Sequence, residues 1–319
     1  MSGISVLGAG AFGTALAISL AQGGQKVTLW ARDPADMNSA RENRRRLAGF
    51  AFPQSLQVTG DIEKACAAET LLLAVPMQQL AVFLEENATL FRQKTLVACC
   101  KGVDLSSGLG PVEIISNICP NVTPALLSGP SFAADIAGGL PTALTLAAAD
   151  TGVVKRLQSD LTTANIRLYR TTDLIGVETG GALKNVIAIA CGIAIGAGLG
   201  ESARAALMTR GYAEMQRFAR NKGAHSETLA GLSGFGDLAL TCTSEKSRNF
   251  AFGLALGLGN NGAQNATVEG KATAKAVSNL AKSEGLDMPI ANMVAAVLDK
   301  QITVKEAAEM LLARPLKEE

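Results

Sequence analysis

The sequence has a single histidine, His225, and very little aromatic surface. Only 4% of the residues are Phe, Trp or Tyr, and the formal net charge is +1. Proteins that bind nucleic acid usually show a basic face or aromatic side chains on which bases stack, so we expect no nucleic-acid partner. Arg41 and residues 44–46 form the one basic cluster, which we expect on the solvated face of a polar helix. His225 lies in a polar, loop-like segment, so we expect no histidine acid–base catalysis.

The sequence also lacks the patterns of metal sites and of membrane insertion. Its six cysteines form no C-x-x-C pair and have no neighbouring histidines, so we expect reduced core thiols and no metal site. The longest uncharged run, residues 185–200, contains four glycines and is shorter than the ~20 residues that span a bilayer. We expect it to be a buried helix. With no secretory pattern ahead of the first strand, we predict a cytoplasmic protein without membrane insertion.

The length and the hydrophobic periodicity predict two domains. With 319 residues and 48% hydrophobic content, the chain can bury a large core. Apolar runs at 71–75, 95–99, 125–127, 143–146 and 166–169 alternate with helix-compatible segments, as in a mainly parallel sheet covered on both faces. From about Asp173 the period is helical. We predict an α/β fold in which a Rossmann-like doubly wound sheet domain, residues 1–175, precedes an all-α domain, residues 176–319.

The clearest motif is G-x-G-x-x-G at Gly8, Gly10 and Gly13, between an apolar strand and an Ala/Leu-rich helix. The first glycine permits a tight turn, the second lets a pyrophosphate approach the backbone, and the third lets the helix pack closely. A second strand-like run at 26–30 follows at the distance of a βαβ unit. The motif therefore predicts a dinucleotide site at the helix N-terminus. A turn that needs glycine only for packing is the alternative.

The residues after the second strand indicate which dinucleotide is bound. NAD-binding domains usually place an acidic residue there for the ribose 2′-hydroxyl, but this chain has Ala31 followed by Arg32. A guanidinium can pair with a 2′-phosphate, which favours NADP. Asp33 precedes Pro34 and is more typical of a turn. A solvated surface charge is the alternative for Arg32.

With histidine set aside, we expect a lysine to carry the proton for such a cofactor, and Lys184 is the candidate. It lies in a long apolar segment one turn after Gly180 and Gly181, which are on its own helix face. Each glycine costs about 1 kcal/mol relative to Ala in a helix, so we expect them to leave room for a substrate or a second backbone. Burial would lower the lysine pKa towards the ~7 to 8 that suits acid–base work. The alternatives are a lysine that reaches the surface and one that pairs with Glu178.

A second candidate site lies at the start of a predicted helix, where Ser247, Arg248 and Asn249 are consecutive. A hydroxyl, a guanidinium and an amide at a helix N-terminus suit a phosphate. The alternative is an ordinary helix cap at Ser247 or Asn249, with Arg248 solvated.

A series of short motifs occurs together and in order, at residues 8–17, 101–102, 128–133, 180–186, 236–238, 241–243, 247–249 and 268–270. With this set, the chain resembles the bacterial-type NAD(P)-dependent glycerol-3-phosphate dehydrogenases along essentially its whole length. The resemblance implies reversible reduction of dihydroxyacetone phosphate to sn-glycerol 3-phosphate with NADPH or NADH, which supplies glycerophospholipid synthesis.

The resemblance also implies the site residues, with Lys184 as the acid–base group. The implied substrate contacts are Lys101, Gly129, Ser131, Ala133, Asp237, Ser247, Arg248 and Asn249. The implied cofactor contacts, besides the three glycines, are Ala11, Phe12, Arg32, Lys101, Ala133, Arg248, Thr267 and Glu269. Family members often differ at Ala11 and Thr267, which leaves backbone contact there. No second residue for the 2′-phosphate is placed among residues 41–46.

Two other functions stay open at this point. A lysine-dependent reductase of a β-hydroxyacid or another 2-keto substrate would share the chemistry, although the cluster at residues 247–249 argues against it. A non-catalytic dinucleotide sensor would need the glycine turn but not Lys184, Asp237 or Arg248. The partner we expect is a small phosphorylated triose, and the sequence leaves a homodimer open.

Overall fold

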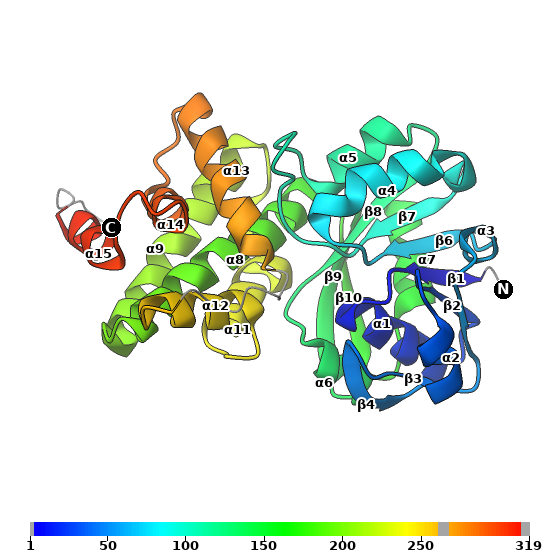
Figure 1. The fold of residues 1–319 in the computed structure, drawn as a ribbon. Coiled ribbons are helices and arrows are strands. Elements are labelled where there is room, and N and C mark those ends of the chain that lie inside the picture. Colours follow the sequence, from blue (N-terminus) through cyan, green and yellow to red (C-terminus); the bar gives the residue numbers. More distant parts are fainter. Residues whose placement is uncertain (1–2, 261–267, 314–319) are drawn as a thin grey trace.

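The chain folds into a sheet domain followed by a helical domain (Figure 1). The computed structural model describes residues 3–260 and 268–313. Its strands are β1 Ile4–Leu7, β2 Val27–Trp30, β3 Glu42–Asn43, β4 Leu47–Ala51, β5 Leu56–Thr59, β6 Thr70–Leu73, β7 Thr95–Ala98, β8 Thr123–Ser128, β9 Thr142–Ala148 and β10 Ile166–Thr171. The helices of the sheet domain are α1 Ala11–Gln22, α2 Ala35–Ala40, α3 Ile62–Ala65, α4 Leu80–Asn87, α5 Pro111–Ile118, α6 Ala133–Ala137 and α7 Thr151–Leu161, with 3-10 turns at Met77–Gln79 and Ala88–Phe91.

The helical domain begins directly after the last strand. Its helices are α8 Leu174–Gly196, α9 Gly200–Asn221, α10 Ser226–Ala230, α11 Asp237–Cys242, α12 Arg248–Gly257, α13 Glu269–Glu284, α14 Pro289–Leu298 and α15 Val304–Leu312, with a π-helical turn at Leu232–Gly236. Asp173 caps α8, because its Oδ1 accepts a hydrogen bond from the Gly176 N–H at 2.9 Å. The fold class predicted from the sequence is confirmed.

The main sheet has the strand order β10-β9-β8-β7-β6-β1-β2-β5. All neighbouring pairs are parallel except β8 and β9, which run antiparallel. Alternate residues of the central strands enter different cores: Val6 and Leu72 face one layer of helices, and Leu7 and Leu71 face the other. The sheet is therefore buried on both faces, which explains why its strands are continuous apolar runs in the sequence.

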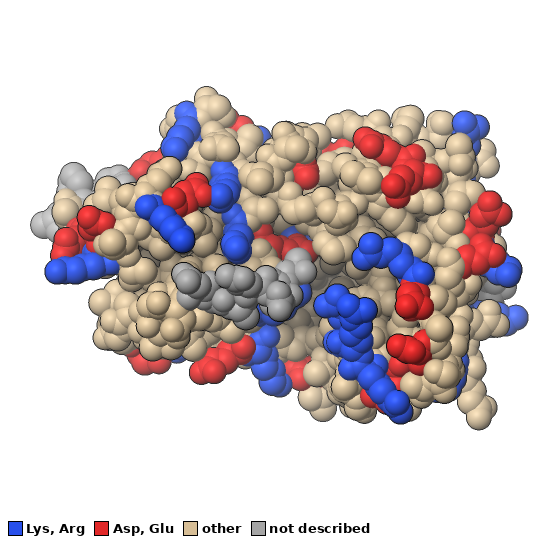
Figure 2. All heavy atoms as spheres, in the orientation of Figure 1, with Lys and Arg blue, Asp and Glu red and all other residues tan. Residues whose placement is uncertain are grey.

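The basic cluster does not lie on a helix, and this prediction is wrong. Residues 44–46 form the exposed turn of a hairpin between β3 and β4, and Figure 2 shows basic side chains gathered over the region where Figure 1 places this hairpin and α1. Arg41 ends α2 with a φ of 50°, and its Nη2 donates hydrogen bonds to the carbonyls of Pro53 and Leu56. Gly49, with a φ of 89°, has a backbone conformation that a helix does not accommodate.

Helix α8 is the central helix of the second domain. It is the one helix of the described residues that is long and apolar enough to cross a membrane, but 89% of its apolar window is buried inside the protein. The buried helix predicted for residues 185–200 therefore exists, although it ends at Gly196.

Helix α12 crosses α8 with the two backbones in contact. A Cβ atom on Gly192 would lie 2.2 Å from the Phe250 carbonyl oxygen, and one on Gly253 would lie 2.1 Å from that of Ile189. Only glycine permits this approach. The crossing fixes the start of α12 relative to the middle of α8, where Lys184 lies.

Candidate functional site

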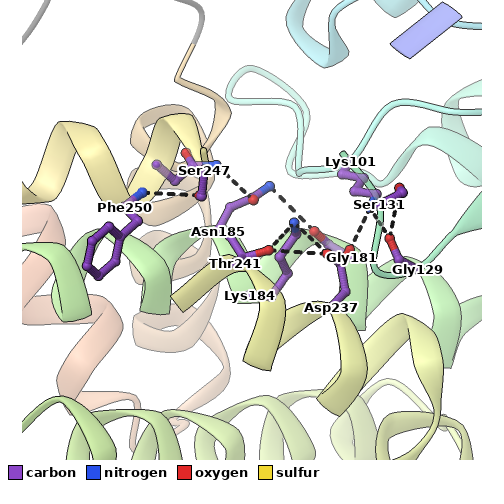
Figure 3. A network of polar contacts seen from close by, with 11 residues as sticks. Lys101, Gly129, Ser131, Gly181, Lys184, Asn185, Asp237, Thr241, Ser247 and Phe250 are labelled. Carbon is purple, nitrogen blue, oxygen red and sulfur yellow. Dashed lines mark hydrogen bonds and ion pairs between the residues drawn. The ribbon is translucent and has the colours of Figure 1, made fainter. Parts of the chain in front are cut away.

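Two lysines and one aspartate meet where α8 passes the carboxyl edge of the sheet (Figure 3). Asp237, the first residue of α11, accepts hydrogen bonds from Lys184 Nζ at 2.9 Å and from Lys101 Nζ at 2.5 Å, one on each carboxylate oxygen. Lys184 is 7% exposed and Asp237 only 1%. A carboxylate this deeply buried is stable only when paired, and here it pairs with one lysine from each domain.

Burial and charge act in opposite directions on the protonation of this cluster. Burial lowers the pKa of Lys184 to about 8, although the negative charge of Asp237 partly opposes the shift. Burial alone would raise the pKa of Asp237, but Lys101 and Lys184 outweigh it and hold this pKa below its usual value. The aspartate is thus ionised at neutral pH, while Lys184 populates both of its protonation states.

Thr241 completes the surroundings of the Lys184 ammonium group. Its Oγ1 accepts a hydrogen bond from Lys184 Nζ at 2.8 Å and donates one to Asp237 Oδ1 at 3.2 Å. Sequence reasoning assigned no role to this residue. The sequence feature that could have identified it is its spacing of four residues from Asp237, which places both side chains on one face of α11.

The two glycines before Lys184 make room for neighbouring parts of the chain. A Cβ atom on Gly180 would lie 2.7 Å from the Ser233 carbonyl oxygen, in the π-helical turn that precedes Asp237. One on Gly181 would lie 2.7 Å from Ser128 Oγ. The space expected beside the lysine therefore admits a second backbone at Gly180.

Lys184 follows neither of the alternatives considered for it. It is buried rather than extended to the surface, and its acidic partner is Asp237 rather than Glu178. Glu178 instead accepts a hydrogen bond from the Val112 N–H at 2.7 Å, and burial raises its pKa to about 7.

Lys101 joins the cluster to the loop after β8. Its Nζ also donates a hydrogen bond to the Gly129 carbonyl at 3.0 Å, and the Ser131 hydroxyl donates to the same oxygen at 3.3 Å. Gly129 has a φ of 137°, a conformation that favours glycine. Ala133 begins α6 shortly afterwards. Gly129 and Ser131, two of the predicted substrate contacts, therefore lie next to Lys101.

The three residues predicted to bind phosphate at the start of α12 lie in different surroundings. Ser247 is the helix cap, because its Oγ accepts a hydrogen bond from the Phe250 N–H at 3.3 Å. Arg248 is exposed. The Asn249 side chain donates to Asn185 Oδ1 at 2.8 Å and accepts from the Gly270 N–H at 3.0 Å, so it joins α12 to α8 and α13. Asn185, which no sequence argument singled out, is thereby fixed beside Lys184.

The glycine turn has the geometry of an anion site. Gly8 has a φ of 118°, and a Cβ atom on Gly13 would lie 2.2 Å from the Gly8 carbonyl oxygen, so both glycines are required by the backbone. A Cβ atom on Gly10 would meet no atom within 4 Å, which leaves open space in front of the helix. Ala11 and Phe12 begin α1, which has no side-chain cap. Their N–H groups can face an anion in that space.

The remaining predicted cofactor residues lie on two other elements. Arg32 is exposed just after β2. Glu269 begins α13, and burial raises its pKa although a hydrogen bond from the Met77 backbone opposes the shift. Thr267 lies outside the described residues. His225 is exposed, and its backbone is engaged at both ends: its N–H donates to Asp173 Oδ2 at 2.9 Å, and its carbonyl accepts from the Thr228 N–H at 3.2 Å.

Comparison with known proteins matches both domains to one family. The model of the NAD-dependent glycerol-3-phosphate dehydrogenase N-terminus matches residues 3–154, and that of its C-terminus matches residues 173–309. The glycerol-3-phosphate dehydrogenase (NAD(P)+) of Ruegeria sp. (strain TM1040) is 60% identical over 99% of both chains. That of Cereibacter sphaeroides is 58% identical over 99% of this chain and 100% of the relative. The crystal structure of glycerol-3-phosphate dehydrogenase from Coxiella burnetii has a TM-score of 0.93 at 35% identity, over 98% of this chain and 99% of that one.

Replacing Asp237 should leave the buried ammonium group of Lys184 and the partly buried one of Lys101 without their carboxylate. We expect Asp237→Asn to lower the free energy of unfolding by about 3 kcal/mol near pH 7, because an unpaired buried charge is strongly destabilising. The loss should be smaller at pH 10. Without the charge of Asp237, the folded variant releases the Lys184 proton at a lower pH than the folded parent, whose pKa is about 8. Between these two pH values only the variant gains stability as pH rises, so the loss shrinks there and stays constant above about 8, where both proteins gain equally.

Urea unfolding at pH 7 and pH 10 measures this effect. The control is Asp135→Asn, which breaks a surface ion pair with Lys246 at 3.3 Å and should change stability by less than about 1 kcal/mol. Equal, pH-independent losses in both variants would contradict the assigned role of Asp237.

Proposed function

The chain belongs to the NAD-dependent glycerol-3-phosphate dehydrogenase family, and from that membership we propose which of its residues carry out the reaction. The protein is an NAD(P)-dependent oxidoreductase that interconverts dihydroxyacetone phosphate and glycerol 3-phosphate. We propose that the product supplies glycerophospholipid synthesis. The observation that carries the residue assignment is the buried contact of Lys184, Asp237 and Lys101 at the carboxyl edge of the sheet.

The cofactor is assigned to the glycine turn of the sheet domain, which we place at residues 1–175. The open space at Gly10 fits the pyrophosphate, with the first N–H groups of α1 as donors. Arg32 is assigned to the 2′-phosphate of NADP, and Glu269 to the cofactor at the domain junction. When bound, the nicotinamide cofactor supplies or accepts the hydride.

Lys184 is assigned as the proton carrier. As an ammonium group it donates a hydrogen bond to the C2 carbonyl oxygen of the ketone and gives its proton to the alkoxide that forms there. In the opposite direction the neutral amine takes the proton of the C2 hydroxyl. A pKa of about 8 suits both directions, because neither form is rare at neutral pH.

Lys101 and Asp237 hold the charge balance around that proton. Asp237 keeps the two ammonium groups in place, and the positive charge of Lys101 stabilises negative charge on the substrate oxygen. When Lys184 has given up its proton, the pair of Lys101 and Asp237 remains neutral. The substrate phosphate is assigned to Arg248 and the start of α12, where a guanidinium stands beside a helix N-terminus.

We further propose that the reaction takes place in the cytoplasm. All six cysteines are buried and unpaired, which fits a reducing compartment.

Lys184→Ala should abolish turnover while leaving the fold and the cofactor site intact. Loss of a general acid–base group lowers the rate by about 10² to 10⁴, and more if the group also stabilises alkoxide charge. The measurement is kcat of the folded variant together with its NADPH affinity. Lys222→Ala, which removes a lysine paired with Glu284, is the control and should retain activity. A Lys184→Ala variant with kcat within tenfold of the parent would exclude Lys184 as the proton carrier.

The pH dependence should have opposite signs in the two directions. Reduction needs the ammonium form of Lys184, so kcat/KM for dihydroxyacetone phosphate should fall as pH rises through about 8. Oxidation needs the neutral amine, so kcat/KM for glycerol 3-phosphate should rise over the same range. Profiles measured in both directions check this. Profiles of the same sign would show that another group titrates.

Arg248→Ala should impair only substrates that carry a phosphate. Loss of a charge-assisted contact should reduce kcat/KM for dihydroxyacetone phosphate about 30-fold, which corresponds to about 2 kcal/mol. Activity with unphosphorylated dihydroxyacetone should stay the same. Arg210→Ala, at an exposed arginine of α9, serves as the control for general loss of positive charge. An equal factor on both substrates would refute the phosphate assignment.

A further inference from the structure

The hairpin of β3 and β4 is attached to the glycine turn by one buried side chain, that of Asn43. Its Nδ2 donates a hydrogen bond to the Ala9 carbonyl at 3.0 Å and another to Thr14 Oγ1 at 2.8 Å. Asn43 is 3% exposed, although it lies in a strand of only two residues. Figure 1 shows this hairpin beside α1. A polar residue this deeply buried therefore contacts the turn to which the cofactor is assigned.

The orientation of the Asn43 amide follows from its other partners. Its Oδ1 accepts a hydrogen bond from the Arg46 N–H at 3.2 Å, within the hairpin turn. Reversing the amide would place its oxygen against the Ala9 carbonyl and its NH₂ group against the Arg46 N–H, so both contacts would be lost. The side-chain oxygen of Asn43 thus accepts a hydrogen bond within the hairpin, and its side-chain nitrogen donates to the glycine turn.

The contact with Ala9 determines where the next N–H group points. The Ala9 carbonyl and the Gly10 N–H belong to the same peptide unit, and in a planar trans peptide they point in opposite directions. A carbonyl held towards Asn43 therefore directs the Gly10 N–H away from the hairpin. The first backbone hydrogen bond at the start of α1 runs from Thr14 N to the Gly10 carbonyl at 2.9 Å. The Ala9 carbonyl therefore takes no part in the backbone hydrogen bonds of α1 and can accept the hydrogen bond from Asn43.

We propose that Asn43 is a positioning residue for cofactor binding, which holds the Ala9–Gly10 peptide with its N–H directed at the pyrophosphate. The proposal rests on the assignment of the glycine turn as the cofactor site. Asn43 does not touch the cofactor in this role and reads no feature that distinguishes NADP from NAD. Its loss should therefore weaken both cofactors equally, because both contain the same pyrophosphate. Preorganised donors bind an anion more tightly than a peptide that must first be oriented.

The test measures dissociation constants of the folded Asn43→Ala variant by calorimetry. We expect NADPH, NADH and ADP to bind about tenfold more weakly, since the net contribution of one hydrogen bond corresponds to roughly this factor. AMP has no pyrophosphate and should bind within about twofold of the parent. At saturating cofactor, kcat and the KM for dihydroxyacetone phosphate should be unchanged. Asn43→Asp, which has the same shape but no donor for Ala9, should weaken the pyrophosphate ligands at least as much.

Three comparisons separate this role from others. Asn165→Ala removes a similar amide-to-carbonyl bond, to Ile136 O at 3.0 Å in the same domain, and should lower stability without changing cofactor affinity. Arg32→Ala should weaken NADPH alone. Gly10→Val fills the open space at the turn and should abolish binding of both cofactors if the turn holds the pyrophosphate.

Each outcome bears on one of the two assignments. Unchanged cofactor affinity in Gly10→Val would overturn the cofactor site itself. A Gly10→Val variant that loses binding, with Asn43→Ala equal to the parent, would overturn only the role of Asn43. If Asn43→Ala weakens the binding of NADPH alone, or weakens the binding of AMP as much as that of ADP, the role of Asn43 is also overturned while the cofactor site stands. If Asn43→Ala does not fold, the comparison is made with Asn43→Asp, and unchanged ADP binding there also overturns the proposal.

Discussion

The buried carboxylate of Asp237 is the interaction on which the rest of the site depends. It accepts a hydrogen bond from one ammonium group in each domain, that of Lys101 in the sheet domain and that of Lys184 in the helical domain. Because Asp237 is only 1% exposed, water cannot take the place of the two lysines as its hydrogen-bond partners. The same contact therefore joins the two domains and keeps Asp237 ionised, while burial lowers the pKa of Lys184 to about 8 against the opposing charge of Asp237.

Close backbone packing makes this buried contact geometrically feasible. Gly180 lets the π-helical turn before Asp237 approach α8, and Gly181 leaves room for Ser128 at the end of β8. The crossing of α8 and α12 through Gly192 and Gly253 brings the start of α12 to the same region. Larger residues at these positions would separate the backbones, and the lysine would then be solvated with a higher pKa.

The other end of the site follows the same design, in which a polar side chain from a distant segment holds a functional group in place. Asn43 orients the glycine turn from the β3–β4 hairpin, as Asp237 orients Lys184 from α11. Both ends lie at the carboxyl edge of a parallel sheet, where ligands of doubly wound folds bind. The proposed reaction thus places a preorganised anion site and a preorganised proton carrier on the two domains.

Local pattern alone determined the alternation of strands and helices, the glycine turn and the burial of Lys184, because period and spacing act within a few residues. It did not predict that Lys101 shares the Asp237 carboxylate with Lys184, nor the contacts of Thr241. The basic cluster was placed on a helix because its composition allows one, whereas a hairpin forms and Asn43 joins it to a turn more than 30 positions earlier in the chain. These contacts link residues far apart in the sequence, and only the packing of the folded chain decides which of them meet.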